Sequence, residues 1–135
     1  MLASKLHNLR MRELCMSLSI EIRRTDRVVI LELAGRLSVL EPSLRDLAWE
    51  LIEHGERYFV ISLANVSYLD NSGLGQLCWI YTVLQNRGGD MALLRPTSRI
   101  KKLLEITKLD TVLQSFESEI QAVASIPALR SAVST

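Results

Sequence analysis

The sequence predicts an α/β fold: one domain with a mixed, mostly parallel sheet of four to five strands, helices packed against it and an N-terminal β-hairpin. Apolar residues alternate over residues 17–33 with an interruption at Thr25-Asp26, which indicates two antiparallel strands. Farther along, short apolar runs alternate with helical periodicities, a pattern typical of parallel strands joined by right-handed crossovers. The 135 residues are 48% apolar and 23% charged, which suits one packed domain and excludes wholesale disorder.

The first half of the chain supplies the hairpin, a helix and a buried strand. The second hairpin strand is apolar on both faces, so we expect it to be central, and Gly35 is expected to end it. Pro42 suits the first turn of a helix that Gly55 stops. The apolar positions of this helix recur at intervals of three and four: Leu40, Leu44, Leu47, Ala48, Leu51 and Ile52. The run over residues 58–63 lacks polar alternation, as expected of a strand covered on both faces.

The second half repeats the alternation of helix and strand. We expect a helix from about Ser72 to Asn86, a strand at residues 91–94, a helix capped by Ser98, a weak strand at residues 112–116 and a last helix near residues 118–124. The domain is therefore assigned to residues 16–126, preceded by an extension over residues 1–15 and followed by a tail over residues 127–135. The extension is either a mobile arm or a short amphipathic helix.

Charge and composition exclude several classes of function. Lys and Arg total 16 against 15 Asp and Glu, so the net charge of +1 provides no field for a polyanion, and we expect no direct binding of nucleic acid. Two cysteines and two histidines provide neither a disulfide framework nor a clustered metal site, so we predict no metal and no cofactor. No apolar run approaches the length of a transmembrane helix, and no signal peptide is recognised, which favours a cytoplasmic protein.

The informative segment is residues 65–75, which leaves the buried strand and enters a helix. Ser72 is thereby placed near a helix N-terminus, where unpaired amides and the helix dipole favour negative charge. A nucleophile elbow requires Gly two residues before the serine, where this sequence has Asp70. A dinucleotide fingerprint requires Gly at position 78, where this sequence has Cys. Neither motif is therefore present. Helix capping is a common use of the residue types at Asp70, Asn71 and Ser72 and stays open beside a functional role.

The helix that follows Ser72 is apolar on more than one face. Its core positions are predicted to be Leu74, Leu77, Cys78, Tyr81 and Leu84. Gly75, Trp79, Ile80 and Val83 then lie on other faces, where they either form a docking surface or pack under a neighbouring helix. Residues 95–108 carry a local charge of +4, which fits a solvated helix face or a patch for an anionic partner.

Three segments in one order carry a family resemblance: Leu69-Asp70-Asn71-Ser72-Gly73-Leu74-Gly75, then Arg87-Gly88-Gly89 before a strand, then residues 98–110. Together they resemble the STAS domain of anti-sigma factor antagonists over about residues 17–124. The resemblance implies that an anti-sigma factor with a serine kinase fold phosphorylates Ser72 and that a serine phosphatase removes the phosphate. This sequence departs from the family pattern at Asn71, where serine is usual, and at Ser38, where aspartate is frequent.

We therefore expect an anti-anti-sigma factor, not an enzyme, that binds its anti-sigma factor until Ser72 is phosphorylated. The acceptor loop and the partner-binding surface are predicted to comprise Asp70, Asn71, Gly73, Leu74, Gly75, Trp79 and Ser38. Phosphorylation adds about −1.5 to −2 charges, which a helix N-terminus tolerates, so binding rather than folding should change. The alternatives are a constitutively bound STAS subunit of a lipid-transport ATPase complex and a small enzyme with a Ser72 nucleophile, which lacks an evident base. Weak homodimer formation is compatible with the sequence.

Overall fold

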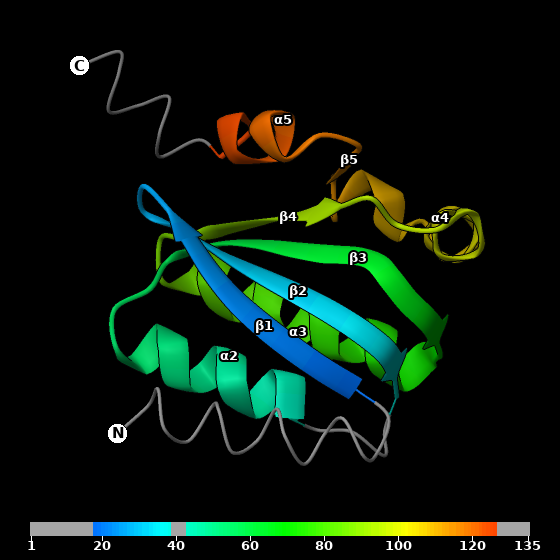
Figure 1. Cartoon of the computed structure of the whole chain (residues 1–135), viewed down its shortest axis with the longest axis horizontal. Coiled ribbons are helices and arrows are strands. Elements are labelled where there is room, and N and C mark those ends of the chain that lie inside the picture. Colours follow the sequence, from blue (N-terminus) through cyan, green and yellow to red (C-terminus); the bar gives the residue numbers. More distant parts are fainter. Residues whose placement is uncertain (1–17, 39–42, 127–135) are drawn as a thin grey trace.

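A five-stranded sheet in the order β1-β2-β3-β4-β5 organises the domain (Figure 1). The computed structural model describes residues 18–38 and 43–126, so the expectations for residues 1–15 and 127–135 lie outside the described residues. β1 (Leu18–Thr25) pairs antiparallel with β2 (Val28–Leu37). β3 (Tyr58–Leu69), β4 (Asp90–Leu94) and β5 (Ser115–Phe116) continue the sheet in parallel. The predicted mixed sheet with an N-terminal hairpin is confirmed.

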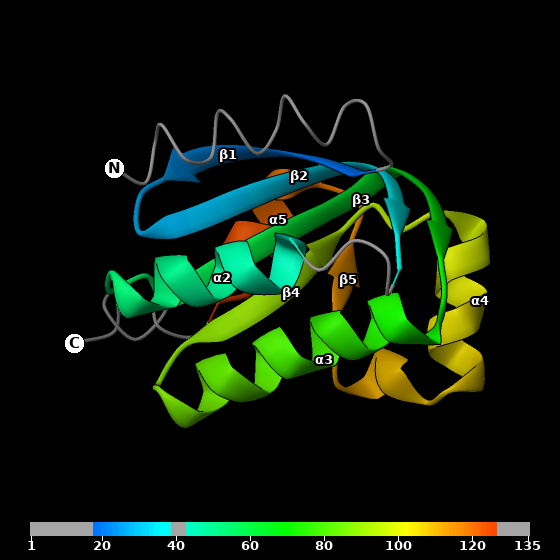
Figure 2. The same ribbon diagram turned by 90° about the horizontal axis from the view of Figure 1, so that it is seen from below.

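Helices cover both faces of this sheet. α2 (Ser43–Glu53) and α3 (Asn71–Asn86) lie side by side on one face, whereas α5 (Glu119–Ala124) lies on the other (Figure 2). α4 (Ser98–Ile106) stands beside the end of β3 and the start of α3. The carboxyl ends of β2 and β3 and the first turn of α3 are therefore gathered at one edge of the molecule.

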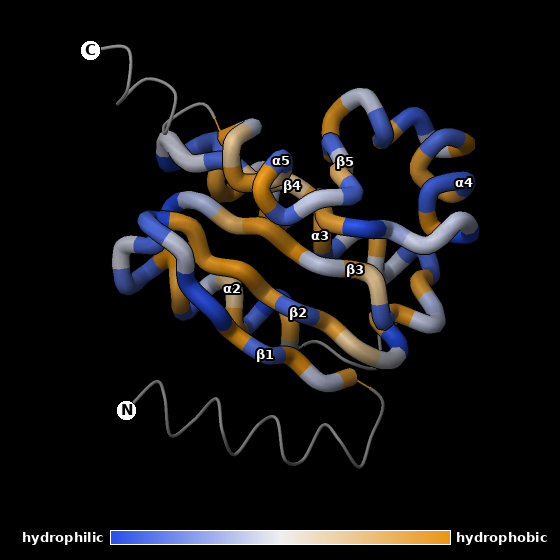
Figure 3. Tube along the Cα trace, turned by 45° about the horizontal axis from the view of Figure 1, so that its top comes forward, coloured by the Kyte–Doolittle hydropathy of each residue, from blue (hydrophilic) through white to orange (hydrophobic). Residues whose placement is uncertain are grey.

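The central strands are buried on both faces, as their sequences predict. Val29 and Leu31 of β2 belong to the large core under α2 and α3, while Val28 and Ile30 belong to a smaller core with Ala122 of α5. Figure 3 shows β2 and β3 as largely hydrophobic strands over the part covered by helices. Fully burying one such Val or Ile side chain contributes about 1.5–3 kcal/mol, so the sheet is a rigid base for the loops at its edge.

Two strands run farther than the sequence analysis expected. Gly35 does not end β2: with φ of 110° it accommodates irregular pairing, and the strand continues to Leu37. β3 likewise extends past Leu63 to Leu69, because Val66 and Leu69 pair with the prolonged β2. The chain consequently passes from Leu69 of a strand into the first turn of α3 with only Asp70 between them.

Two further expectations are corrected, and one open alternative is decided. The cap of α4 is Thr97 rather than Ser98, since the Thr97 hydroxyl accepts a hydrogen bond from the Ile100 amide at 3.3 Å. The predicted strand at residues 112–116 is reduced to the two residues of β5, because a 3-10 helix, η1 (Leu109–Thr111), and a turn at residues 112–114 come before it. For Ile80, which was expected either to dock a partner or to pack under a neighbouring helix, the structure shows the second alternative: Ile80 is fully buried, and α2 packs against α3.

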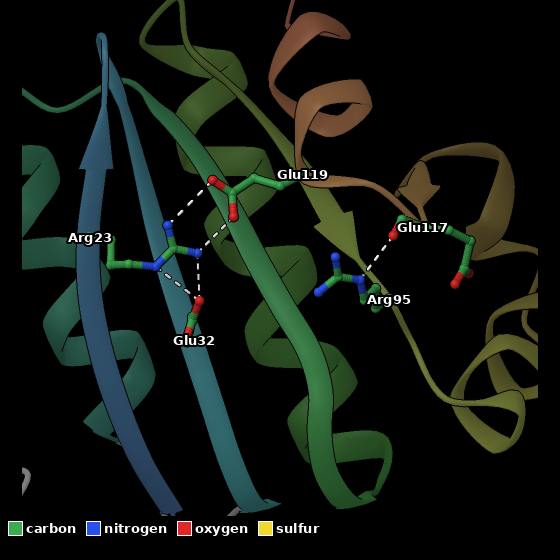
Figure 4. Close-up of polar contacts among 5 residues, drawn as sticks. All are labelled: Arg23, Glu32, Arg95, Glu117 and Glu119. Atoms are coloured by element: carbon green, nitrogen blue, oxygen red, sulfur yellow. Dashed lines mark hydrogen bonds and ion pairs between the residues drawn. The ribbon is translucent and has the colours of Figure 1, made fainter.

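A network of charges holds α5 to the sheet (Figure 4). Arg23 of β1 donates hydrogen bonds to Glu32 of β2 and to Glu119 in the first turn of α5. Beside it, Arg95 donates to the Glu117 carbonyl at 2.9 Å, and its own amide donates to the Phe116 carbonyl. These contacts fix the segment that joins β5 to α5.

Candidate functional site at the start of α3

Asp70 caps α3 and thereby fixes the turn that presents Ser72. Its backbone is extended, and its carboxylate accepts a hydrogen bond from the Gly73 amide at 2.8 Å. Its carbonyl accepts from the Leu74 amide at 2.9 Å, which begins the helical ladder. Of the three residues predicted as caps, Asp70 alone supplies the capping group, so α3 does not depend on Ser72 for its first hydrogen bonds.

Ser72 is exposed in the first turn of α3. Within the described residues its hydroxyl makes no hydrogen bond. Asn71 is exposed beside it, and the first turn of α3 contains no acidic residue. A free hydroxyl at the positive end of a helix dipole is accessible to a modifying enzyme, and a negative group placed there is stabilised by the adjacent amides.

The two glycines that follow Ser72 have different surroundings. A Cβ on Gly73 would overlap the Leu37 carbonyl oxygen and approach the Leu69 side chain to 2.9 Å. A Cβ on Gly75 would meet nothing within 4 Å. Gly73 is therefore required by the packing of α3 against the end of β2, whereas Gly75 leaves open space on the outer surface of the helix. The sequence analysis had included both glycines in the acceptor loop and partner-binding surface.

Gln76 connects α3 to the segment that follows β2. Its side-chain amide donates a hydrogen bond to the Ser38 carbonyl at 3.1 Å, and both residues are buried. The Gln76 Oε1 atom is buried without a hydrogen-bond partner among the described residues. Ser38 is only 6% exposed, so it could influence a partner only by positioning the chain segment that follows β2. Sequence reasoning missed Gln76, whose burial depends on a chain segment 38 residues away.

Trp79 lies two turns along α3 from Ser72, on the side that faces α2. Its ring packs against Trp49 of α2 with a centroid distance of 5.8 Å, and the Arg45 guanidinium lies 4.5 Å from its centroid. Leu74, next to Ser72, is 4% exposed and part of the core. Cys78 is partly buried, and this burial raises the pKa of its thiol, which disfavours the reactive thiolate.

A groove opens beside the acceptor turn, between the end of β3 and α4. Its volume is about 290 Å³, and its lining is mostly apolar, with two cationic side chains on α4: Val66, Ser67, Tyr68, Leu69, Thr97, Arg99, Ile100, Lys102, Leu103 and Ile106. Ile106 is 68% exposed. Arg99 and Lys102 make no ion pair within the described residues, whereas Lys101 on the neighbouring face pairs with Glu117 at 2.8 Å. The basic run noted in the sequence is thus divided between a paired and an unpaired side.

The described residues contain no group of three His, Cys, Asp or Glu side chains that could hold a metal ion. In the same part of the chain, no helix has the length and apolar character needed to cross a membrane. Ser72, Gly75 and the groove contribute small, apolar and cationic groups to the surface. The roles in the acceptor loop and in partner binding stay predictions for all seven residues named for them: Asp70, Asn71, Gly73, Leu74, Gly75, Trp79 and Ser38.

Comparison with known proteins assigns the fold to a family. A STAS domain model matches residues 19–122. An anti-sigma F factor antagonist of Paenibacillus polymyxa is 27% identical over 113 residues, which cover 82% of this chain and 97% of that protein. An anti-sigma-B factor antagonist of Staphylococcus aureus is 32% identical over 95 residues, covering 70% and 88% of the two chains. The chain belongs to the STAS domain family of anti-sigma factor antagonists.

Solved structures agree with this STAS fold. The crystal structure of an anti-sigma factor antagonist from Mycobacterium paratuberculosis has a TM-score of 0.74. It is 19% identical in sequence and covers 82% of this chain and 95% of its own. At this level of identity, the similarity shows a shared fold and nothing further.

Proposed function

We propose that this STAS domain is a cytoplasmic anti-anti-sigma factor whose binding to an anti-sigma factor with a serine kinase fold is controlled by phosphorylation of Ser72. The observation that carries the proposal is the exposed Ser72 hydroxyl in the first turn of α3, in a turn that Asp70 caps independently. A serine phosphatase would restore the binding form. The names of the curated relatives support an anti-sigma factor as the partner.

Physical considerations favour control of binding rather than of folding. A phosphate on Ser72 would lie at a helix N-terminus, where the interaction with the dipole stabilises negative charge by about 0.3–1 kcal/mol. The same group adds about −1.5 to −2 charges to an exposed surface beside Asp70 and Gly75, where a partner must come close. Electrostatic repulsion and the cost of desolvating the phosphate then destabilise the complex, while the free domain keeps its fold.

The experiment combines the chain with ATP and the serine-kinase-fold anti-sigma factor encoded in the same genome. We expect mass spectrometry to place one phosphate on Ser72 and Ser72→Ala to abolish it. Ser98→Ala is the matched control, because Ser98 is also exposed in the first turn of a helix and follows a separate cap at Thr97. Phosphate at another residue, or incorporation unaffected by Ser72→Ala, would overturn the assignment.

A binding measurement completes the test. Ser72→Asp should weaken association with the anti-sigma factor by about tenfold or more, since one tenfold step requires only 1.4 kcal/mol. Its melting temperature should stay within about 5 °C of the unmodified chain. Undiminished binding by Ser72→Asp and by the phosphorylated chain would instead indicate a constitutive STAS interaction module.

A further inference from the structure

Five side chains from α2, α3 and the C-cap of α3 form a continuous series of contacts on the helical layer. The Arg45 guanidinium lies over Trp79, Trp79 packs against Trp49, and the Arg87 guanidinium lies 5.0 Å from the Trp49 centroid. Arg87 also pairs with Glu53 at 3.2 Å. We call the series Arg45, Trp79, Trp49, Arg87 and Glu53 the aromatic stack. Its contacts hold large side chains in place before any partner arrives, which reduces the entropy lost on binding.

The aromatic stack leaves its central ring accessible. Trp49 is 39% exposed, which makes it one of the four large apolar residues that are exposed in the described part of the chain. Tryptophan and arginine are the residue types most enriched at the centres of protein interfaces. The exposed edge of Trp49, with cations stacked on both rings, is therefore the best anchor for association on this side of the domain.

Along one row of α2, Arg45 and Glu53 flank Trp49 with opposite charges, while Asp46 and Glu50 belong to the neighbouring row. Arg45, Trp49 and Glu53 are spaced by four residues and form one ridge of the helix, so the backbone positions of Arg45 and Glu53 lie about 6 Å from that of Trp49 along the axis. Half a turn about an axis through Trp49 reverses the order of the charges. Arg45 then faces Glu53 of the partner subunit, and Trp49 lies against its own copy.

We propose that this STAS domain forms a homodimer through α2, with the two-fold axis at Trp49. A uniformly acidic or basic partner would meet one repelling charge on the ridge, whereas a second copy presents both charges in the matching order. The contact is isologous, so each ion pair forms twice. Because the ridge is short, we expect a weak dimer with a dissociation constant of about 10 µM to 1 mM, in the class of small transient interfaces.

The dimer is tested with the unmodified chain alone, without ATP or anti-sigma factor, so its outcome is independent of Ser72 phosphorylation. Sedimentation equilibrium between about 10 µM and 1 mM should show a monomer–dimer equilibrium. Arg45→Glu and Glu53→Arg should each weaken it by about tenfold or more, because each places like charges opposite one another twice. Trp49→Ala should do the same, and Lys102→Glu on α4 should have no effect.

Charge exchange gives the sharpest result. An equimolar mixture of the Arg45→Glu and Glu53→Arg chains should associate as a heterodimer, and the double variant R45E/E53R should again form a homodimer. Circular dichroism confirms that each exposed-site variant is folded before it is mixed. A chain that stays monomeric at 1 mM, a dimer unaffected by either reversal, or folded variants that fail to associate when mixed would overturn the proposal.

Discussion

At the start of α3, the cap and the exposed hydroxyl belong to different residues. Asp70 satisfies the Gly73 amide, while Ser72 contributes nothing to the hydrogen bonds of the turn within the described residues. The sequence analysis had left helix capping open beside a functional role for all three residues from Asp70 to Ser72. Only the backbone geometry separates the two roles, because Asp, Asn and Ser are nearly equivalent as caps in sequence.

Removing the Asp70 carboxylate should destabilise the domain, whereas removing the Ser72 hydroxyl should not. We expect Asp70→Ala to lower the free energy of unfolding by about 1 kcal/mol, the usual cost of losing an N-cap. Ser72→Ala should change it by less than about 0.5 kcal/mol, as is usual for an exposed surface position. Urea unfolding of the three chains measures both values. A loss of stability in Ser72→Ala equal to that in Asp70→Ala would contradict the assignment of the cap.

The two neighbouring glycines provide a matched pair for alanine substitution. Gly73→Ala should cost about 1–3 kcal/mol, because its Cβ overlaps the Leu37 carbonyl and the backbone has to shift. Gly75→Ala should leave stability unchanged or raise it by up to about 1 kcal/mol, since alanine is the better helix former and the space is open. If Gly75 provides clearance for the anti-sigma factor, this stable variant should bind it more weakly. Thermal unfolding and titration calorimetry separate the two effects.

Among the secondary-structure elements, α4 gives the surface beside Ser72 its charge. A standard interface covers about 800 Å² on each partner, so a partner centred on Ser72 also covers neighbouring elements. The groove between β3 and α4 supplies exposed Ile106 and the cations Arg99 and Lys102, which form no ion pair with the described residues. These groups fit a partner segment that carries apolar side chains flanked by carboxylates, and a phosphate on Ser72 would reduce the positive potential that attracts it.

Reversing a charge in the groove should therefore weaken binding of the anti-sigma factor. We expect Lys102→Glu to lower its affinity by about tenfold and to reduce the dependence of the association rate on salt. Lys101→Glu is the control, because Lys101 pairs with Glu117 outside the groove and should alter affinity by less than about twofold. Surface plasmon resonance at two salt concentrations provides both rates. Equal effects of the two reversals would argue against the groove as part of the interface.

The attachment of α5 should depend on pH through Glu119. Hydrogen bonds from Arg23 lower the pKa of Glu119, and the charge of Arg95 acts in the same direction. A carboxylate whose pKa is lowered in the folded state contributes stability at neutral pH, and this contribution is lost as the pH falls through that lowered pKa. The ion pair between Arg23 and Glu119 is partly exposed, and Arg23 also pairs with Glu32. The contribution of Glu119 to the free energy of unfolding should therefore stay below about 1 kcal/mol.

Glu119→Gln should accordingly be less stable than the unmodified chain at pH 7 and equally stable in acid. Urea unfolding at a series of pH values measures the difference directly. Glu105→Gln on exposed α4 should track the unmodified chain throughout. A difference that persists unchanged into acid would show that Glu119 acts through packing rather than through its charge.

At the scale of the whole molecule, the topology was predictable because its signals are local. The alternation around Thr25-Asp26, the apolar run of β3 and the helical spacing after Ser72 each identify an element without reference to another. The features that could not be predicted depend on contacts between distant segments. The burial of Ile80 depends on α2, and the extension of β3 to Leu69 depends on the irregular pairing at Gly35. The different space around Gly73 and Gly75 depends on the Leu37 carbonyl, which lies against Gly73 only.

The candidate site was found from sequence only in part, for the same reason. The position of Ser72 near a helix N-terminus follows from the order of strand and helix. Gln76 and the groove beside α4 were not anticipated, since their residues come from elements that meet only in the folded chain. The +4 charge of residues 95–108 was visible, but only the ion pair of Lys101 shows which cations remain unpaired.

The shortness of β5 would leave β4 open to strand addition, a common start of aggregation. The amides of β4 that face β5 are nevertheless occupied. The amides of Leu93 and of Arg95, the residue that follows β4, donate to the carbonyls of Gln114 and Phe116. The Met91 amide, beyond the reach of β5, donates to the Asp90 carboxylate at 2.8 Å. An incoming strand would have to displace each of these bonds, so a two-residue strand and one aspartate protect this border of the sheet from intermolecular pairing.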